Sequence, residues 1–308
     1  MSNVSQTTIG MLLLILLVLQ PEREAVGQSQ SKKIRFSNNA ARQTGQTAAT
    51  PASHAPVAGR SSAQAQLIKT LNARANVVKQ LDAPVTIKIP GAPKIKGSLQ
   101  VEFPKRMRLK AGVLGMSEMG VDAGSNEQQF WVWSKMALPG SPAALYFANH
   151  AQYQNSQARS QIPLEPEQII NALGLVTIDP NGQHFGPFPE GKKHVRMYTV
   201  ENVNGSQQTR VMLINATTAA VEQTSVYDHN NQLVAYANAL KFKDYSKFNI
   251  TLPQKIELHA AQPGQDDFIL KVDLGTYSVN SLYGDPQQIW AMPEARNVPR
   301  VDLGTAGN

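Results

Sequence analysis

The sequence predicts a mainly β fold with two helices, in which about ten or eleven antiparallel strands form an incomplete, strongly curved barrel. Short apolar runs that alternate with polar residues follow one another through most of the chain, and turn sequences separate the later ones. One of these turns, Asn204-Gly205, is the strongest short-range hairpin signal. A twisted sheet of this many strands curls, so we expect the two helices to cover its open side.

The N-terminal strands are expected within residues 83–135. Val85, Ile87 and Ile89 alternate with polar residues, and later runs repeat the pattern, so each strand can bury one face of a sheet. The stretch ends in an aromatic run at 130–133. Residue types that usually carry out catalysis are scarce among these strands. The pattern therefore indicates a wall around an apolar interior.

Three hairpins are expected in the second half of the chain. Each consists of two strand-like runs on either side of a short segment rich in Asn, Asp, Gly or Pro. The paired runs are 195–203 with 208–214, 220–227 with 233–242, and 255–260 with 268–279. Sequential hairpins of this kind give an antiparallel sheet whose strands lie in chain order.

Two segments have the period of a helix instead. Within residues 62–81, apolar residues recur at intervals of three and four, which predicts an amphipathic helix that Asp82 and Pro84 would end. A second, shorter helix is expected over residues 166–173, because prolines precede it, glutamates lie in its first turn and Gly174 follows it.

The first 27 residues have the pattern of an export signal. Residues 9–19 form an apolar run interrupted only by Gly10, and the small residues at 25–27 favour cleavage before Gln28. This run is short for a membrane span, which needs about 20 residues. The segment before it has no lysine or arginine, so an uncleaved membrane anchor stays open as the alternative.

Composition divides the rest of the chain. Residues 28–60 contain few large apolar residues, so we expect a disordered basic tether, followed by the half-barrel domain at 61–282 and a C-terminal tail at 283–308. Residues 25–81 hold eight basic residues and no acidic one, whereas the body is close to neutral. The tether could contact an anionic membrane or the cell wall weakly. Its sparse charge argues against nucleic acid as a partner.

The order of these elements resembles the lipoprotein-sorting carrier and receptor family LolA/LolB, over about residues 65–282. An N-terminal amphipathic helix, a turn leading to a tryptophan strand at 124–133 and a leucine-rich and proline-rich helix at 162–175 carry the resemblance. The closing strands at 252–258 and 268–274 are similar as well. The resemblance implies a periplasmic or envelope protein, an incomplete barrel capped by helices, whose apolar cavity holds the acyl chains of a lipoprotein.

Apolar residues of the strands and helices are the candidates for lining such a cavity. They are Leu71, Val78, Val101, Phe103, Met107, Leu109, Met119, Phe130, Trp131, Trp133 and Ile169. The flexible side chain of methionine suits an irregular cavity. Each residue fits an ordinary core equally well, so the sequence does not separate a hollow barrel from a filled one.

The sequence departs from the family in two places. In the carrier, an Arg-Pro pair on an early strand provides the arginine that closes the lid, whereas the matching pair here is Phe103-Pro104. Only Arg106 and Arg108 lie nearby as candidate gate residues. The receptor is a lipoprotein, but this chain has no cysteine to acylate. The protein therefore need not perform the task of either relative.

Catalytic and cofactor motifs are weak. The stretch 115–120 has its second glycine one residue too late for a nucleophile elbow, and the histidines lack the spacing of a compact zinc site. We therefore expect a non-enzyme without cofactor or metal. Two functions stay open: an envelope carrier that binds acyl chains or another lipid, and a structural or interaction module with a filled core on the same scaffold. A hydrolase is a more distant third.

Overall fold

The computed structural model describes most of the chain after residue 61. The described ranges are 62–88, 94–113, 116–134, 143–153, 156, 166–203, 206–260 and 268–305. The export signal predicted at 1–27 and the tether predicted at 28–60 lie outside these residues.

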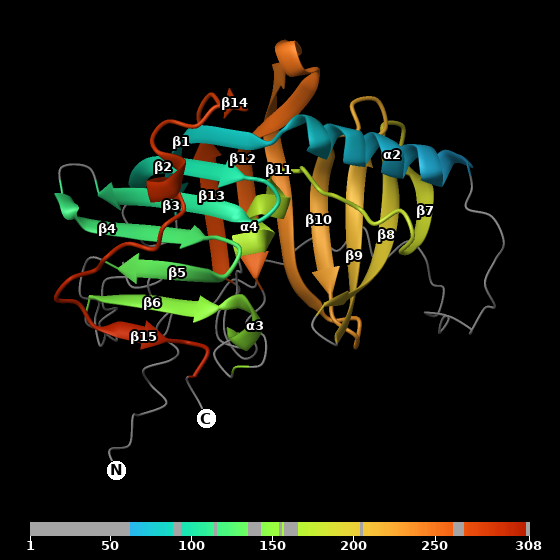
Figure 1. Cartoon of the computed structure of the whole chain (residues 1–308). Coiled ribbons are helices and arrows are strands. Elements are labelled where there is room, and N and C mark those ends of the chain that lie inside the picture. Colours follow the sequence, from blue (N-terminus) through green and yellow to red (C-terminus); the bar gives the residue numbers. More distant parts are fainter. Residues whose placement is uncertain are drawn as a thin grey trace, which may run out of the picture.

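A single open sheet of fifteen strands dominates the described part (Figure 1). The strands are β1 (Gln80–Lys88), β2 (Ile95–Glu102), β3 (Arg106–Val113), β4 (Met116–Ser125), β5 (Gln129–Ser134), β6 (Ala144–Asn149), β7 (Gln183–Glu190), β8 (His194–Val203), β9 (Ser206–Asn215), β10 (Val221–Tyr227), β11 (Leu233–Tyr245), β12 (Ile250–Ala260), β13 (Phe268–Leu274), β14 (Ser278–Val279) and β15 (Arg300–Asp302). Their order in the sheet is β15-β6-β5-β4-β3-β2-β1-β13-β12-β11-β10-β9-β8-β7, and β14 pairs with β1. All pairs are antiparallel except that of β15 with β6.

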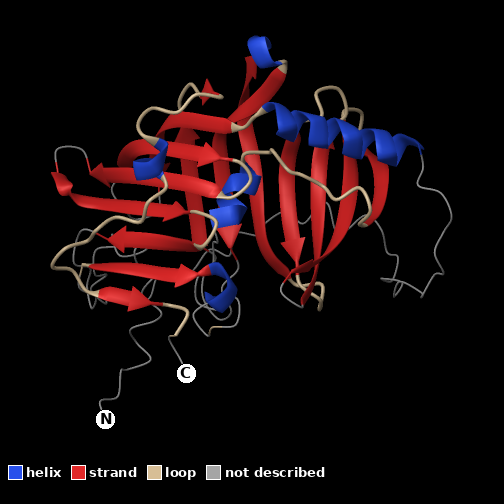
Figure 2. Ribbon diagram, in the orientation of Figure 1, coloured by secondary structure: helices blue, strands red, loops and turns tan. Residues whose placement is uncertain are grey.

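The sheet has two arms that meet at β1. One arm consists of β2 to β6 with β15, and the other runs from β13 back to β7. The pairing of β1 with β13 joins them, with Val85 opposite Leu274 and Ile87 opposite Val272. Figure 2 shows the two arms turned at an angle to each other, with the helices placed along them. Strands from the two ends of the sequence therefore lie side by side at the centre of the molecule.

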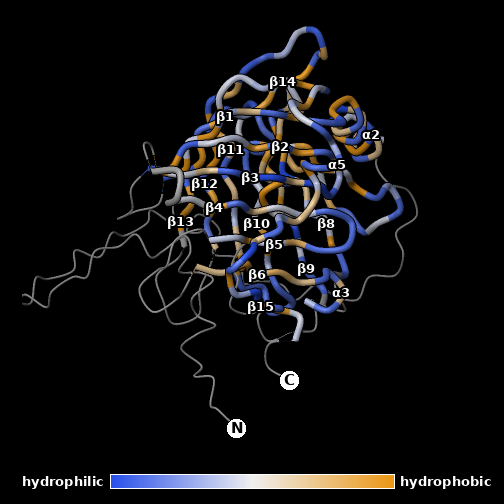
Figure 3. The backbone as a smooth tube through the Cα atoms, turned by 60° about the vertical axis from the view of Figure 1, so that its left-hand side comes forward, coloured by the Kyte–Doolittle hydropathy of each residue, from blue (hydrophilic) through white to orange (hydrophobic). Residues whose placement is uncertain are grey.

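Alternation along each strand gives the sheet two different faces. On β1, Val85 and Ile87 are buried, whereas the residues that follow each of them, Thr86 and Lys88, are only half-buried. We call the face that contains Val85 and Ile87 the inner face and the opposite one the outer face. Figure 3 shows hydrophobic and hydrophilic residues alternating along the strands in this way. Following the register from strand to strand keeps the inner face continuous from β5 through β1 to β8.

Two helices pack on the inner face. They are α2 (Ser62–Val77), which lies along the second arm, and α4 (Pro166–Ala172), which lies between the arms (Figure 1). Three further short elements are α3 (His150–Tyr153), α5 (Pro286–Ile289) and the 3-10 turn η3 (Ser246–Phe248). The mainly β fold with two helices over an open, curved sheet is confirmed.

The first helix is shorter than its sequence predicts. Residues 62–81 have helical period, but α2 ends at Val77 and β1 begins at Gln80. The side chain of Asn280 pairs backbone groups that a further helical turn would otherwise pair. Its amide donates to the Val77 carbonyl, and its oxygen accepts the Lys79 N–H at 2.7 Å. Leu81 then pairs with Val279 and with Val101. Pairing on both sides of the strand outweighs the local helical pattern.

The sheet has more strands than the ten or eleven expected. The three predicted hairpins are present as β8–β9, β10–β11 and β12–β13. The strand β7 was missed because its sequence, rich in glycine and proline, is unfavourable for a strand interior. The residues after 283, for which no element was expected, provide α5 and the three-residue edge strand β15.

Candidate ligand-binding face

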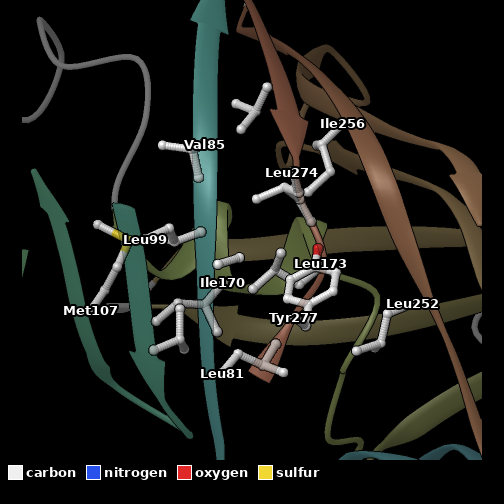
Figure 4. Packing of buried hydrophobic residues seen from close by; sticks show 14 of the residues in the cluster. Leu81, Val85, Leu99, Met107, Ile170, Leu173, Leu252, Ile256, Leu274 and Tyr277 are labelled. Carbon is white, nitrogen blue, oxygen red and sulfur yellow. The ribbon is translucent and has the colours of Figure 1, made fainter. Parts of the chain in front are cut away.

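The inner face of the sheet carries a large apolar cluster where the two arms meet. The first arm contributes Leu81, Leu99 and Val101, each 5% exposed or less, from β1 and β2. Leu252 and Ile256 of β12 contribute from the second arm. Figure 4 shows the side chains from the two arms converging on one volume. The cluster is therefore shared between the arms rather than belonging to one of them.

The helix α4 fills the middle of this volume. Ile170 and Leu173 are 2% and 1% exposed and lie between the strands of the two arms (Figure 4). The helix begins at Pro166, which suits a first helical position. It ends before Gly174, whose φ of +76° is a conformation that glycine adopts without strain. Leu175 returns to the same cluster.

Apolar surface continues beyond α4 along the first arm. Leu109, Ala123 and Val132 lie opposite one another on β3, β4 and β5, so they form a row across the inner face. All three are only half-buried, and so is Ile169 of α4. The inner face thus has a packed centre and a partly open apolar margin.

The helix α2 covers a second apolar cluster on the other arm. Its Ile68 and Leu71 pack on Met197, Met212 and Ile214, which are all fully buried on β8 and β9. The buried residues of the helix recur at the spacing of a single helical face.

Polar side chains tie α2 to its surroundings as well. The side-chain amide of Asn72 donates to the Ile178 carbonyl and accepts the Ile178 N–H, each at 2.8 Å. Arg74 donates to the carbonyls of Thr218 and Thr251, at 2.6 and 3.0 Å. Gln64 donates to two backbone carbonyls of β7. The helix is thus fixed along its whole length.

A shallow cavity of about 380 Å³ lies on the flank of α2. It is lined by Ala65, Ile68, Lys69, Asn72, Ala73, Asn76 and Pro180. Its wall is formed by the helix and by the segment that leads from α4 to β7, so it is separate from the volume between the arms.

Six of the residues predicted to line a cavity come together at the central cluster. Val78, Val101 and Met107 are at most 2% exposed within it, and Phe103, Leu109 and Ile169 pack against it. Side chains with so little exposure border no space large enough for water. An acyl chain would therefore need room that opens when a covering element moves.

The remaining predicted residues lie elsewhere. Leu71 belongs to the cluster under α2, and Phe130 packs edge-to-face on Tyr153 in a small cluster near α3. Trp131 and Trp133 lie on the outer face, since Phe130 and Val132, which alternate with them, occupy the inner one. The side chain of Met119 lies outside the described residues.

Arg108 is buried on the outer face, where it holds the C-terminal segment. It forms an ion pair with Asp122 and donates to the carbonyls of Ile289 and Ala291, at 3.0 and 2.5 Å. The guanidinium also lies 5.1 Å from the centre of the Trp131 ring. The structure therefore places this candidate gate residue on the side of the sheet away from α4.

Arg106, the other candidate gate residue, is the first residue of β3. It pairs with Glu102 and Glu127 at 2.9 and 2.6 Å, and all three side chains are substantially exposed. The hydrogen bond with Glu127 raises the pKa of Arg106 and lowers the pKa of the Glu127 carboxyl. Arg106 thus contacts the strand ends and not α4.

Within the described ranges, a catalytic or metal-binding site would need several polar side chains gathered in one place. Nowhere in these ranges do three or more His, Asp or Glu side chains gather as metal ligands. Ser125 and His150 are 3.4 Å apart, but the Nε2 atom of His150 lies 2.8 Å from the Asn126 carbonyl, which can only accept a hydrogen bond. That nitrogen carries a proton, so it does not serve as a base for Ser125.

Residues that sequence reasoning missed lie mainly on the second arm. Leu252, Ile256 and Leu274 face α4 across the cluster, as do Ile170 and Leu173 of the α4 region (Figure 4). Their alternation with polar neighbours marked them as buried. Nothing in the sequence indicated that β13 pairs with β1, and this pairing brings them to the site.

Solved structures with a similar arrangement of strands include a protein domain named for outer membrane lipoprotein sorting, from Vibrio parahaemolyticus. It is 10% identical, with a TM-score of 0.49, over 73% of this chain and 95% of that one. A LolA superfamily protein from Nitrosomonas europaea is 12% identical, with a TM-score of 0.46, over 73% and 97% of the two chains. A DUF1329 family protein from Desulfovibrio piger is 12% identical, with a TM-score of 0.43, over 74% and 98%.

A LolA superfamily protein is thus among the solved structures that match this chain. No protein-family model matches the chain, and neither does any curated protein. At such identities and TM-scores the likeness says nothing of a ligand or partner. Within the described ranges, no helix has the length and apolar character needed to cross a lipid bilayer.

Proposed function

We propose that the protein is a non-catalytic carrier of the cell envelope, which takes up acyl chains of a lipoprotein or another lipid on its inner face. One observation carries the proposal: α4 covers the centre of an apolar face that continues, partly open, at Leu109, Ala123 and Val132. An acyl chain entering along this margin would bury apolar surface that is now in contact with water.

The apolar contacts of α4 make it the covering element that can move. Residues 169–175 contribute Ile170, Ala172, Leu173 and Leu175 to the cluster, and no described side-chain hydrogen bond joins this segment to the sheet. A ligand chain that takes the place of α4 would restore the same kind of contact. The exchange therefore leaves no buried polar group without a partner.

The apolar run and small residues within 1–27 support export to the envelope, and the basic residues at 28–60 would keep the protein near an anionic surface. Both segments stay predictions from the sequence. The second candidate, an interaction module with a filled core, is supported by the packing at the cluster centre, where Val78 and Val101 are 0% exposed.

Fatty acids of increasing chain length test the carrier. Each added methylene in contact with the inner face contributes up to about 0.8 kcal/mol, so affinity should rise steadily with length. Tryptophan emission is a poor readout, because Trp131 lies on the outer face. Calorimetry or displacement of a fluorescent fatty acid is preferable.

A spin label on α4 tests the mechanism. The chain has no cysteine, so Asn171→Cys provides a single labelling site on the half-buried side of this helix. Its mobility should increase when a long-chain fatty acid is added, whereas a label at Thr70→Cys on α2 should not respond. Affinity independent of chain length, with both labels unchanged, would refute the carrier and favour the interaction module.

A further inference from the structure

The free edge of the second arm exposes two phenylalanines. The strand β7 is the last in the order of the sheet, and its Phe185 and Phe188 are 47% and 52% exposed. Phe188 packs edge-on against Tyr198 of the neighbouring strand, with ring centres 6.0 Å apart. No core needs these two rings, since the cluster under α2 lies on the opposite face of the arm.

A bulge in β7 brings both rings to one face. Phe185 lies opposite Tyr198 and Phe188 lies opposite Arg196, so three residue steps on β7 match two on β8. In a regular strand, residues three apart point to opposite faces. Gly186 makes the bulge possible, because its φ is +100° and a Cβ there would lie 2.6 Å from the Arg196 carbonyl. The backbone is therefore built to present the two phenylalanines together.

The turn that follows carries positive charge. Lys192 and Lys193 are exposed between β7 and β8, and neither forms an ion pair with a described residue. The nearby Arg196 is neutralised by an ion pair with Glu190. The hairpin thus carries two exposed aromatic rings on β7 and two ammonium groups in the turn that follows.

The edge of β7 is closed to another strand. Pro187 and Pro189 have no N–H to donate, and Gln64 of α2 occupies the carbonyls of His184 and Gly186. A partner peptide would find few backbone groups to pair with. The hairpin would therefore contact a partner through its side chains and not through backbone hydrogen bonds.

We propose that the β7–β8 hairpin docks the protein on an anionic lipid surface. Phe185 and Phe188 enter the boundary between headgroups and acyl chains, and Lys192 and Lys193 face the anionic headgroups. Apolar rings beside ammonium groups are the pattern of an interfacial anchor. The site is distinct from the inner face, and it does not require that face to bind anything.

Sedimentation with vesicles tests the proposal on the full chain. Vesicles of phosphatidylcholine, with and without phosphatidylglycerol, are compared for the wild type, Phe185→Ser/Phe188→Ser and Lys192→Gln/Lys193→Gln. The phenylalanine pair should lose about tenfold or more in partitioning to both kinds of vesicle. The lysine pair should lose about tenfold on anionic vesicles only, and salt should have the same effect.

Matched controls separate this site from other effects. Leu233→Ser removes a side chain that is 40% exposed at the far end of β11, and it should partition like the wild type. Phe188→Leu keeps an apolar side chain, so most binding should remain. Uptake of fatty acid should be unchanged in all variants, which keeps the test independent of the proposed carrier function.

Several results would overturn the proposal. The wild type could fail to bind anionic vesicles, or the phenylalanine pair could bind as well as the wild type, which would assign binding to charge elsewhere in the chain. An equal loss in Leu233→Ser would show that no particular surface is involved. Self-association that the phenylalanine substitutions abolish, without vesicle binding, would assign the hairpin to a contact between two copies.

Discussion

The two helices on the inner face are held in different ways. The side chains of α2 make six described hydrogen bonds to backbone groups of the sheet, of the turn after β9 and of the segment after α4, and Asn280 holds its end. The region of α4 is held by apolar contacts through Ile170, Ala172, Leu173 and Leu175.

This difference would give the two helices different parts in the proposed carrier. Moving α2 would leave backbone carbonyls and side-chain amides without partners, and each such group costs about 1–3 kcal/mol when it stays buried. Moving α4 exposes apolar surface that a lipid chain can cover again. From the sequence, both helices are expected to cover the open side of the sheet. The contacts favour α4 as the one that can move.

Truncating one leucine under each helix should give the largest effects. Leu71→Ala and Leu173→Ala should each lower the free energy of unfolding by about 2–5 kcal/mol. We expect Leu71→Ala in the upper half of this range, since α2 is fixed and cannot settle into the space. Leu173→Ala should fall in the lower half, because α4 can move inward.

Adding a fatty acid should distinguish the two leucine variants. A long-chain fatty acid should recover stability in Leu173→Ala more than in Leu71→Ala, as measured by the shift of the thermal midpoint. The reverse order of the two losses, or equal recovery, would mean that α4 is as firmly fixed as α2.

Three asparagines give a smaller and more direct test. Asn72→Ala should cost about 1–3 kcal/mol, because it leaves the backbone groups of Ile178 without partners. Asn171→Ala on α4 and Asn76→Ala on the exposed side of α2 should each stay within about 0.5 kcal/mol of the wild type. Denaturation by urea provides the measurement. A loss for Asn171→Ala like that for Asn72→Ala would show a polar restraint on α4.

The smallest expected effect concerns the ion pair of Lys88 with Asp273, which joins the two arms at β1 and β13. Burial raises the pKa of the Asp273 carboxyl, but its hydrogen bond and charge interaction with Lys88, and then those with Lys255, outweigh burial and leave that pKa lowered. A carboxyl with a lowered pKa stabilises the fold above its unfolded pKa, and this contribution is lost as pH falls through the folded value. The loss therefore lies in acid, below about pH 4.

Asp273→Asn should remove this part of the pH dependence. The expected change is under about 1 kcal/mol at neutral pH, because both side chains are about one-third exposed. Unfolding followed across the acid range, for the variant and the wild type, measures it. A variant with the same acid sensitivity as the wild type would show that the Lys88 pair does not contribute to holding β1 on β13.

Much of the fold follows from local patterns. The Asn204-Gly205 sequence and the runs on either side of it predicted β8 and β9, and Gly174 predicted the end of α4. The pattern failed where distant pairing decides the outcome: Leu81 fits a helix by spacing but lies in β1. Short strands such as β15 have too few residues for any period.

The site was predictable in part. Alternation placed Val101 and Met107 correctly on one face, and the structure joins them. Phe130 and Trp131 are neighbours in a strand, so they cannot both line the same face. The sequence does not tell which of the two faces inward. In the structure Phe130 faces inward, and Trp131 faces outward beside Arg108, which contacts the C-terminal segment.

The pairing of β1 with β13 also governs the order in which the molecule can form. Val85 meets Leu274 only after nearly the whole chain is available. Contacts between such distant residues slow folding, because a long loop has to close before they form. Until then, one edge of β1 and the apolar cluster behind it stay open to other chains.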